Sequence, residues 1–327
     1  MISASDKALR LPLLLKGKAQ TRIWGGKRLG GECGVPYGEI WSLSVREKDE
    51  ENCTVSGGDF DGMTLKTLIE QTGGSIVGGS YRAGDRFPLL IKLIDTGSDL
   101  SLQVHPTKSY AELRGHDGAK TEMWYVLSHE DGARFLYGMK DGETAETLAT
   151  ALRKGACASL MREREAKPYD VLFVPAGMPH AIGGGIFLAE IQENSDTTYR
   201  LDDYGRRDAN GNLRELHVED GLAVSRPFTE EELEALRYSA ASNPPDAGCI
   251  ADTSLFRVSR VENESLTVGD CFRALIALTE TVIVNGDGEH FTLAPYDTCF
   301  LPAHAGTLTL TGAALFVSVP ALEKTNS

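Results

Sequence analysis

The stretch Asp170-Val-Leu-Phe-Val-Pro-Ala-Gly-Met-Pro-His180 decides the fold. Its four consecutive apolar residues, Val171 to Val174, predict a short strand. Pro175 and Gly177 then predict a turn, and His180 begins the next strand. The stretch therefore predicts a strand–turn–strand unit that places a histidine directly after the turn.

The first part of this unit occurs again near the end of the sequence. Residues 168–176, Pro-Tyr-Asp-Val-Leu-Phe-Val-Pro-Ala, correspond to residues 295–303, Pro-Tyr-Asp-Thr-Cys-Phe-Leu-Pro-Ala. Identical residues at matching spacing suggest a duplicated β unit. The position equivalent to His180 is Thr307 in the second copy.

Most of the other apolar runs are short and are bounded by Gly, Pro, Asn and Asp, which indicates strands. Few segments show helical spacing and capping residues. The balance predicts a mainly β protein with short helical insertions and excludes a doubly wound fold. Strands are expected over 87–94, 123–127, 171–174, 186–191, 273–278, 281–284 and 314–319. Helices are expected over 64–71, 107–114, 143–154 and 229–238.

A small, polar segment with two prolines, residues 239–248, predicts a linker between two domains. Residues 1–238 hold the stretch that ends in His180, so we expect them to form the functional domain. Residues 249–327 hold the second copy of the β unit and form a smaller β domain.

Composition limits the partners and the compartment. Among 327 residues, 47 are acidic and 33 basic, which gives a formal net charge of −14. This charge repels nucleic acid and anionic membranes, so we expect neither as a partner. The N-terminal apolar run is too short for a signal peptide, and no run approaches the roughly 18 residues of a membrane span. Six cysteines without a CxxC pair favour free thiols in a reducing cytoplasm.

A second chemical motif is Ser101-Leu-Gln-Val-His-Pro106. Alternation along a strand places Ser101, Gln103 and His105 on one face. Such polar groups are expensive to bury without partners. This face is therefore either exposed to solvent or lines a wet or metal-containing interior.

A third motif places Lys120 and Glu122 on one face of a strand. Alone, they would be an ordinary surface ion pair. Combined with His105 and His180, Glu122 completes two histidines and a carboxylate, the ligand set of a catalytic zinc site with an open position. Gln103 is a candidate fourth ligand through its amide oxygen. The same set also suits iron, manganese or nickel.

These motifs resemble a known family. The pattern P-x-G-x-x-H after a strand resembles the second motif of the cupin superfamily. The segment Leu188-Ala-Glu-Ile-Gln-Glu-Asn-Ser-Asp-Thr-Thr-Tyr-Arg-Leu201 follows a triple-glycine turn. With Trp24-Gly-Gly, Gly38-Glu-Ile-Trp-Ser42, Gln-Val-His-Pro and Lys-Thr-Glu-Met-Trp-Tyr, it is similar to type I mannose-6-phosphate isomerases of the short bacterial branch, over about residues 10–220.

The resemblance implies a tandem cupin fold of jelly-roll β-barrels, with one zinc ion per chain in the first. Because Thr307 replaces the histidine, we expect the second barrel to be degenerate and metal-free. The implied metal ligands are Gln103, His105, Glu122 and His180. The implied catalytic residues are Arg200, Glu190 and Lys120. The implied substrate-binding residues are Ser101, Lys92 and Asp196.

The implied reaction interconverts D-mannose 6-phosphate and D-fructose 6-phosphate through an enediol or enediolate. A metal and a fixed guanidinium would stabilise the charge that develops on the sugar oxygens. Arg200 stays protonated, so its expected role is electrostatic. Glu190 and a metal-bound water are both candidates for the base. Lys92, helped by Lys120 and Arg206, is expected to neutralise the phosphate.

Two other functions use the same residues. An iron-dependent cupin oxygenase would need the same ligands, but Lys92, Lys120 and Arg200 have no obvious task in it. A non-catalytic sugar-phosphate sensor would share the fold, but every expected polar residue is retained. The sequence leaves open whether the protein is a monomer or a homodimer.

Overall fold

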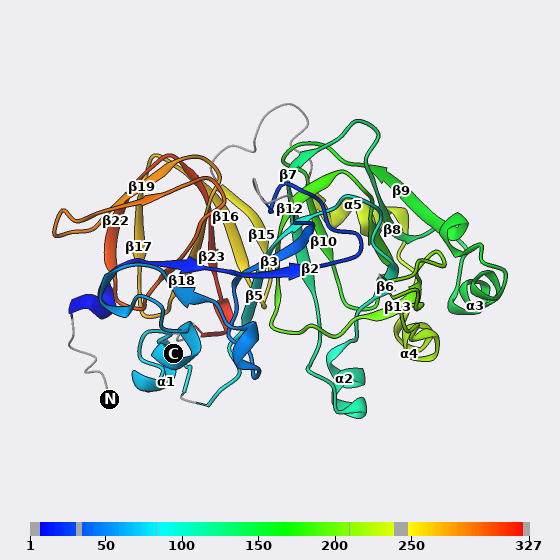
Figure 1. Cartoon of the computed structure of the whole chain (residues 1–327), viewed down its shortest axis with the longest axis horizontal. Coiled ribbons are helices and arrows are strands. Elements are labelled where there is room, and N and C mark those ends of the chain that lie inside the picture. Colours follow the sequence, from blue (N-terminus) through cyan, green and yellow to red (C-terminus); the bar gives the residue numbers. More distant parts are fainter. Residues whose placement is uncertain (1–6, 31–34, 83, 209, 239–247, 323–327) are drawn as a thin grey trace. The chain divides into compact units, whose positions relative to one another are not determined.

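The structure is a computed structural model that describes residues 7–30, 35–82, 84–208, 210–238 and 248–322. Antiparallel strands dominate it, and the helices are short (Figure 1). The predicted mainly β fold class is therefore confirmed. Among the described residues, no helix combines the length and the apolar character needed to cross a membrane.

Two compact units divide the chain discontinuously. Unit 1 comprises Met1–Lys18, Trp41–Ile91 and Pro245–Ser327, and unit 2 comprises Ala19–Ile40 and Lys92–Pro244. This division differs from the linear one expected at residues 239–248, because N-terminal segments belong to the same unit as the C-terminal strands. Most of the expected linker, residues 239–247, lies outside the described residues.

Unit 1 is built on a seven-stranded and a four-stranded sheet. Its helix is α1 (Leu65–Gln71), and its strands are β1 (Leu13–Lys16), β4 (Thr54–Val55), β15 (Gly248–Asp252), β16 (Arg257–Glu262), β17 (Ser265–Val268), β18 (Arg273–Ala277), β19 (Thr281–Val284), β20 (His290–Leu293), β21 (Thr298–Leu301), β22 (Gly306–Thr311) and β23 (Ala313–Ser318). The strand orders are β15-β16-β23-β18-β21-β1-β4 and β17-β22-β19-β20. Strand β1 joins the larger sheet by pairing Leu13 with Phe300, which explains why the N-terminal segment belongs to this unit.

Unit 2 is built on a seven-stranded and a five-stranded sheet, ordered β14-β10-β7-β12-β5-β3-β2 and β13-β6-β11-β8-β9. The boundaries between the units fall within β2, β3 and β5. The strands are β2 (Lys18–Thr21), β3 (Tyr37–Leu43), β5 (Leu89–Asp95), β6 (Leu102–Val104), β7 (Glu122–His129), β8 (Arg134–Met139), β9 (Met161–Glu165), β10 (Val171–Val174), β11 (His180–Ile182), β12 (Ile186–Glu193), β13 (Tyr199–Asp202) and β14 (Arg237–Tyr238). The helices are α2 (Lys108–Arg114), α3 (Ala145–Arg153), α4 (Val218–Val224) and α5 (Glu230–Ala235).

The apolar core of unit 2 surrounds Trp124. Its ring stacks on Phe135 at 5.3 Å between centroids, and both side chains are fully buried. Leu172 and Leu188, from the strands on either side of β7, belong to the same cluster. This packing fixes β7, the strand that begins with Glu122.

The duplicated β unit is visible in the backbone. Tyr169 and Tyr296 occupy equivalent positions before β10 and β21, and both have positive φ, 66° and 74°. Asp170 accepts a hydrogen bond from the backbone N–H three residues earlier, and Asp297 does the same. Because positive φ is rare outside glycine, a shared left-handed tyrosine supports the predicted duplication.

Two local predictions needed correction. The helix expected over 229–238 ends at Ala235, because Arg237–Tyr238 form β14 and pair with β10. Helix α4 was not predicted, because Gly221 lies inside it and glycine is a poor helix former. A Cβ at Gly221 would lie 2.6 Å from Leu201, so close packing explains the glycine.

Candidate active site

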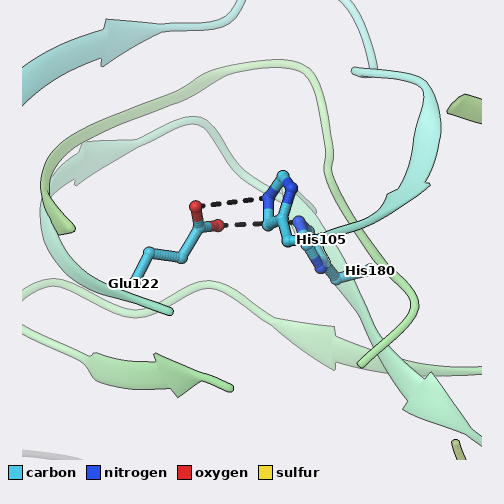
Figure 2. Close-up of side chains that lie close together, drawn as sticks. All are labelled: His105, Glu122 and His180. Carbon is cyan, nitrogen blue, oxygen red and sulfur yellow. Dashed lines mark ion pairs between the residues drawn. The ribbon is translucent and has the colours of Figure 1, made fainter. Parts of the chain in front are cut away.

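Three side chains from different segments meet in the interior of unit 2. His105 follows β6, Glu122 begins β7, and His180 begins β11. Figure 2 shows the two imidazole rings facing the carboxylate of Glu122. The Nε2 atoms of His105 and His180 lie 3.3 and 3.5 Å from its oxygens, and all three side chains are buried.

Backbone carbonyl groups fix the proton on each imidazole. Nδ1 of His105 lies 3.2 Å from the carbonyl oxygen of Thr197, and Nδ1 of His180 lies 2.8 Å from that of Met178. Because a carbonyl only accepts, Nδ1 must donate, and each Nε2 presents a lone pair. Nε2 of His105 makes no hydrogen bond to any described residue. Two lone pairs facing a carboxylate repel one another unless a cation lies between them.

Burial keeps the histidines neutral, and a neighbouring positive charge keeps the acid ionised. Burial, and then the charge of Lys120, lower the pKa of His105 to about 3, and burial also lowers the pKa of His180. Burial opposes the charge of Glu122, but the ammonium of Lys120 holds its pKa well below the usual range. Neutral imidazoles and a carboxylate are the protonation states that bind a divalent metal. The donor set therefore fits such an ion.

Gln103 lies beside this cluster. Its Nε2 is 3.4 Å from Nε2 of His180, and its Oε1 is 3.4 Å from the hydroxyl of Ser101. A half-turn of the amide exchanges its nitrogen and oxygen, which is the orientation that a fourth ligand requires. The structure thus places Gln103 within reach of the cluster, with its amide nitrogen facing His180.

The turn before His180 depends on Gly177. Its φ is +86°, and a Cβ there would lie 2.8 Å from the carbonyl oxygen of Val224. Only glycine satisfies both conditions without strain. Its N–H donates to the carbonyl of His105, so the turn links the segments that carry the two histidines.

A cavity of about 460 Å³ opens beside the cluster, and all of its lining residues belong to unit 2. It contains eight of the predicted site residues: Lys92, Ser101, Gln103, Lys120, Glu122, Glu190, Asp196 and Arg200. Strand pairing explains part of this arrangement. Arg200 is opposite Gln103, and Gln103 is opposite His180, so the three residues form a row across β13, β6 and β11.

Two buried lysines are paired with acids in this cavity. Nζ of Lys120 lies 2.9 Å from Oε2 of Glu122. Nζ of Lys92 lies 3.4 Å from Oε1 of Glu190 and 3.7 Å from Asp196. Burial disfavours the charge of Lys92, but these carboxylates raise its pKa above the usual range.

Glu190 is a carboxyl group with altered acidity. Its side chain is 4% exposed. Burial, and then the negative charge of Glu122, raise its pKa to about 7 although Lys120 and Lys92 oppose the shift. A carboxyl that titrates near neutrality suits proton transfer.

Arg200 is half-buried, and its Nη1 donates to the carbonyl of Glu215 at 2.7 Å. Its Nε is buried and makes no hydrogen bond within the described part of the chain. At least one N–H donor of this guanidinium therefore has no hydrogen-bond acceptor among the described residues.

Sequence reasoning missed several lining residues. Arg22 pairs with Glu39 at 2.9 Å, and Arg214 also lines the cavity. Arg214 lies in a polar loop without strand or helix periodicity, so no pattern identified it. Glu39 stands in a segment used for the family resemblance, and Arg22 lies just before another, but nothing in their spacing indicated a shared cavity.

Comparison with known proteins identifies the family. Residues 13–133 match the family model for the catalytic domain of phosphomannose isomerase type I. The chain is 40% identical to mannose-6-phosphate isomerase ManA of Bacillus subtilis over 219 residues, which is 65% of this chain and 67% of that protein. It is 37% identical to mannose-6-phosphate isomerase of Streptococcus mutans, covering 66% and 69% of the two chains.

The fold agrees with these matches. The crystal structure of mannose 6-phosphate isomerase from Bacillus subtilis aligns over 94% of this chain and 98% of its own, with a TM-score of 0.77 and 28% identity. A putative mannosephosphate isomerase from Archaeoglobus fulgidus shares the fold with a TM-score of 0.74 at 22% identity, over 94% and 98% of the two chains. The chain therefore belongs to the type I phosphomannose isomerase family.

Proposed function

We propose that this enzyme interconverts D-mannose 6-phosphate and D-fructose 6-phosphate with one zinc ion per chain. The names of its relatives support the substrate pair. The observation that carries the proposal is the buried cluster of His105, Glu122 and His180 beside a polar cavity.

The cluster residues would hold the metal through both Nε2 atoms and the carboxylate, with the Gln103 amide oxygen as fourth ligand. Two histidines and a carboxylate with an open position suit catalytic zinc. When bound, the ion supplies Lewis acidity toward the sugar oxygens.

Glu190 is proposed as the base. In its ionised form it removes the proton from C2 of the aldose; the C–H electron pair forms the C1=C2 double bond, and the C1 carbonyl oxygen becomes the enediolate oxygen. The proton of the C2 hydroxyl then moves to this oxygen, and returning the abstracted proton to C1 leaves a carbonyl at C2, which gives the ketose. Its raised pKa of about 7 keeps both forms populated near neutrality. Lys120, beside Glu122, is proposed to act on the same oxygens by hydrogen bonding.

Arg200 is proposed to stabilise the negative charge of the enediolate. Its place in the row with Gln103 and His180 supports this role. A guanidinium keeps its proton at neutral pH, so it acts by charge and not as a base.

Ser101, Lys92 and Asp196 are proposed to bind the substrate. All three line the cavity. Ser101 and Lys92 correspond to residues of the matched motifs that are associated with the phosphate. The Asp196 carboxylate suits a sugar hydroxyl, because it would repel a phosphate dianion.

The remaining features of the proposal concern the rest of the chain. Residues 249–327 are proposed to be metal-free, and exposure of Thr307 supports this assignment. We propose a cytoplasmic enzyme that is a monomer or a homodimer. The free thiols of Cys53, Cys157, Cys249, Cys271 and Cys299 support a reducing compartment.

A pair of histidine variants tests the proposal. His105→Gln should lower both the zinc content and the turnover of mannose 6-phosphate, measured by metal analysis and a coupled assay. His290→Gln is the matched control, because His290 is exposed on β20 in unit 1 and lies outside the cluster. Full turnover by metal-free His105→Gln protein would contradict the proposal.

A further inference from the structure

Two arginines that line the cavity have no function assigned by the motifs: Arg22, which is paired with Glu39, and Arg214. Arg214 lines the cavity together with Arg200. Its Nε donates to Oδ2 of Asp203 at 2.8 Å, and its Nη2 donates to Oδ1 of the same carboxylate. This bidentate pair leaves Nη1 available and fixes the plane of the guanidinium.

Asp203 is a buried anchor for this guanidinium. Its side chain is 5% exposed, and Arg206 also donates to its Oδ1 at 2.5 Å. Arg206 was expected from the sequence to help neutralise the phosphate, but it directs its remaining donors to the carbonyl groups of Asp99 and Asp203 and does not line the cavity. One carboxylate therefore serves two arginines, and only Arg214 reaches the cavity.

The chain holds Arg214 next to Arg200. The carbonyl of Glu215 accepts a hydrogen bond from Nη1 of Arg200, and the N–H of His217 donates to the carbonyl of Arg200 at 2.8 Å. Burial, and then the positive charge of Arg214, lower the pKa of Arg200. Two like charges on one cavity wall are favourable only when an anion lies between or beside them.

The lysine expected to bind the phosphate is already neutralised. Lys92 is 3.4 Å from Glu190 and 3.7 Å from Asp196, so its charge is matched within the cavity. Arg214 shares its single carboxylate with Arg206, and Arg200 donates only to a carbonyl. The excess positive charge of the cavity wall therefore lies at the two arginines.

We infer that Arg214 binds the phosphate group of the substrate, in a guanidinium orientation set by Asp203. This inference rests on the proposed function, because it assigns the phosphate end of the same substrate. Arginine is suited to this task, since its planar donors match phosphate oxygens and keep their charge.

Kinetics of Arg214→Met, compared with wild type, test the inference. The KM for mannose 6-phosphate should rise about 10- to 100-fold, the loss expected for one charge-assisted hydrogen bond, with a smaller change in kcat. Inhibition by inorganic phosphate should weaken by a similar factor. Any turnover of unphosphorylated mannose, assayed at high substrate concentration, should stay within about twofold of wild type, because that substrate lacks the group that Arg214 binds.

Arg206→Met is the matched control. It also removes a hydrogen bond to Asp203, but its side chain does not line the cavity, so the KM should change much less. Equal KM increases in the two variants would overturn the inference, as would an unchanged phosphate inhibition constant in Arg214→Met. A parallel loss of activity on mannose and mannose 6-phosphate would also overturn it.

Binding of inorganic phosphate, measured by calorimetry, separates this inference from the proposed function. If wild-type, metal-loaded protein does not isomerise mannose 6-phosphate, the proposed function fails. Phosphate binding that weakens in Arg214→Met would still support the anion site, and phosphate binding that is equal in both proteins would exclude it.

Discussion

At the scale of single residues, Glu122 is the side chain at which several interactions of the site converge. It accepts a hydrogen bond from Nε1 of Trp124 at 3.0 Å, pairs with Lys120 and faces the lone pairs of His105 and His180. Glu122→Gln keeps the size of this side chain and removes its charge. We expect metal affinity and turnover to fall by more than about 100-fold, beyond the 10- to 100-fold effect of changes outside the ligand shell.

Metal content after dialysis and the rate of mannose 6-phosphate isomerisation measure this effect. Glu163→Gln is the control, because Glu163 is an exposed acid on β9 that pairs with Arg134. A Glu122→Gln protein that retains its metal and its rate would show that the cluster is not the metal site.

Asp203 predicts a specific dependence of stability on pH. Burial opposes its ionisation, but hydrogen bonds from Arg214 and Arg206 outweigh burial and lower its pKa. A carboxyl with a lowered pKa in the folded state stabilises the fold above its usual pKa, and this stabilisation disappears as the pH falls through the lowered value. Asp203→Asn should therefore reduce the free energy of unfolding by about 1–3 kcal/mol at pH 7.

The difference between wild type and Asp203→Asn should shrink below about pH 4, the usual range for an aspartate. Urea unfolding between pH 3 and pH 7 measures it. Asp287→Asn removes an exposed pair with Lys7 and should leave the stability nearly unchanged throughout. A constant Asp203→Asn difference across this pH range would rule out the lowered pKa.

At the scale of elements, the turn before His180 is the feature most sensitive to substitution. Gly177→Ala would force an L side chain into φ +86° and bring its Cβ within 2.8 Å of the Val224 carbonyl. Gly142→Ala meets a similar φ, +82°, but has no atom within 4 Å of its Cβ. The comparison therefore separates backbone strain from collision.

We expect Gly142→Ala to lose about 1–2 kcal/mol of stability and to keep its metal affinity. Gly177→Ala should lose more stability and should also bind zinc more weakly, because the collision displaces the turn that carries His180. Thermal unfolding and zinc titration measure both quantities. Equal zinc affinity in the two variants would show that the turn does not position the ligand.

Local patterns predicted elements well where one residue type decides the geometry. Strand β10 has the predicted bounds, Val171–Val174, and Thr107 caps α2 before Gly115 ends it in the left-handed conformation. Side-chain alternation also placed Gln103 and Ser101 together. Elements decided by tertiary contacts were missed: β14 depends on pairing with β10, and α4 depends on packing of Gly221.

The site residues were likewise predictable from the sequence where a local motif contains them, and not where tertiary contacts bring them together. Residues in strand–turn motifs, such as His105, Glu122 and His180, form one cluster in the structure. The pairing of Lys92 with Glu190 was not predictable, because Lys92 is in β5 and Glu190 in β12, strands separated by almost a hundred residues. Arg214 was not identified as a cavity residue for the same reason, because loop contacts and not sequence spacing determine its neighbours.

At the scale of the whole molecule, each of the two units is assembled from segments that are not continuous in the sequence. The sequence suggested a linear division at residues 239–248, whereas β1 and β4 belong to the sheet of C-terminal strands. Pairing between segments that are distant in the sequence leaves no local signal. Unit 1 therefore needs both ends of the chain, and a fragment that lacks residues 1–60 would leave β21 without its neighbour β1.

Metal removal tests how far the cluster stabilises the molecule. Without a cation, the interior of unit 2 retains Glu122 facing two imidazole lone pairs. Zinc at 1,000 times its dissociation constant should stabilise the fold by about 4 kcal/mol relative to chelated protein. Thermal unfolding measures the shift, which should vanish in His180→Ala; a shift of the same size in that variant would place the zinc elsewhere.

The most direct measurement is a titration of metal-depleted protein with zinc while turnover of mannose 6-phosphate to fructose 6-phosphate is followed. We predict that activity rises linearly and reaches its plateau at one zinc ion per chain. A protein that binds one zinc ion in the His105–Glu122–His180 cluster and still fails to convert mannose 6-phosphate would contradict the proposed function.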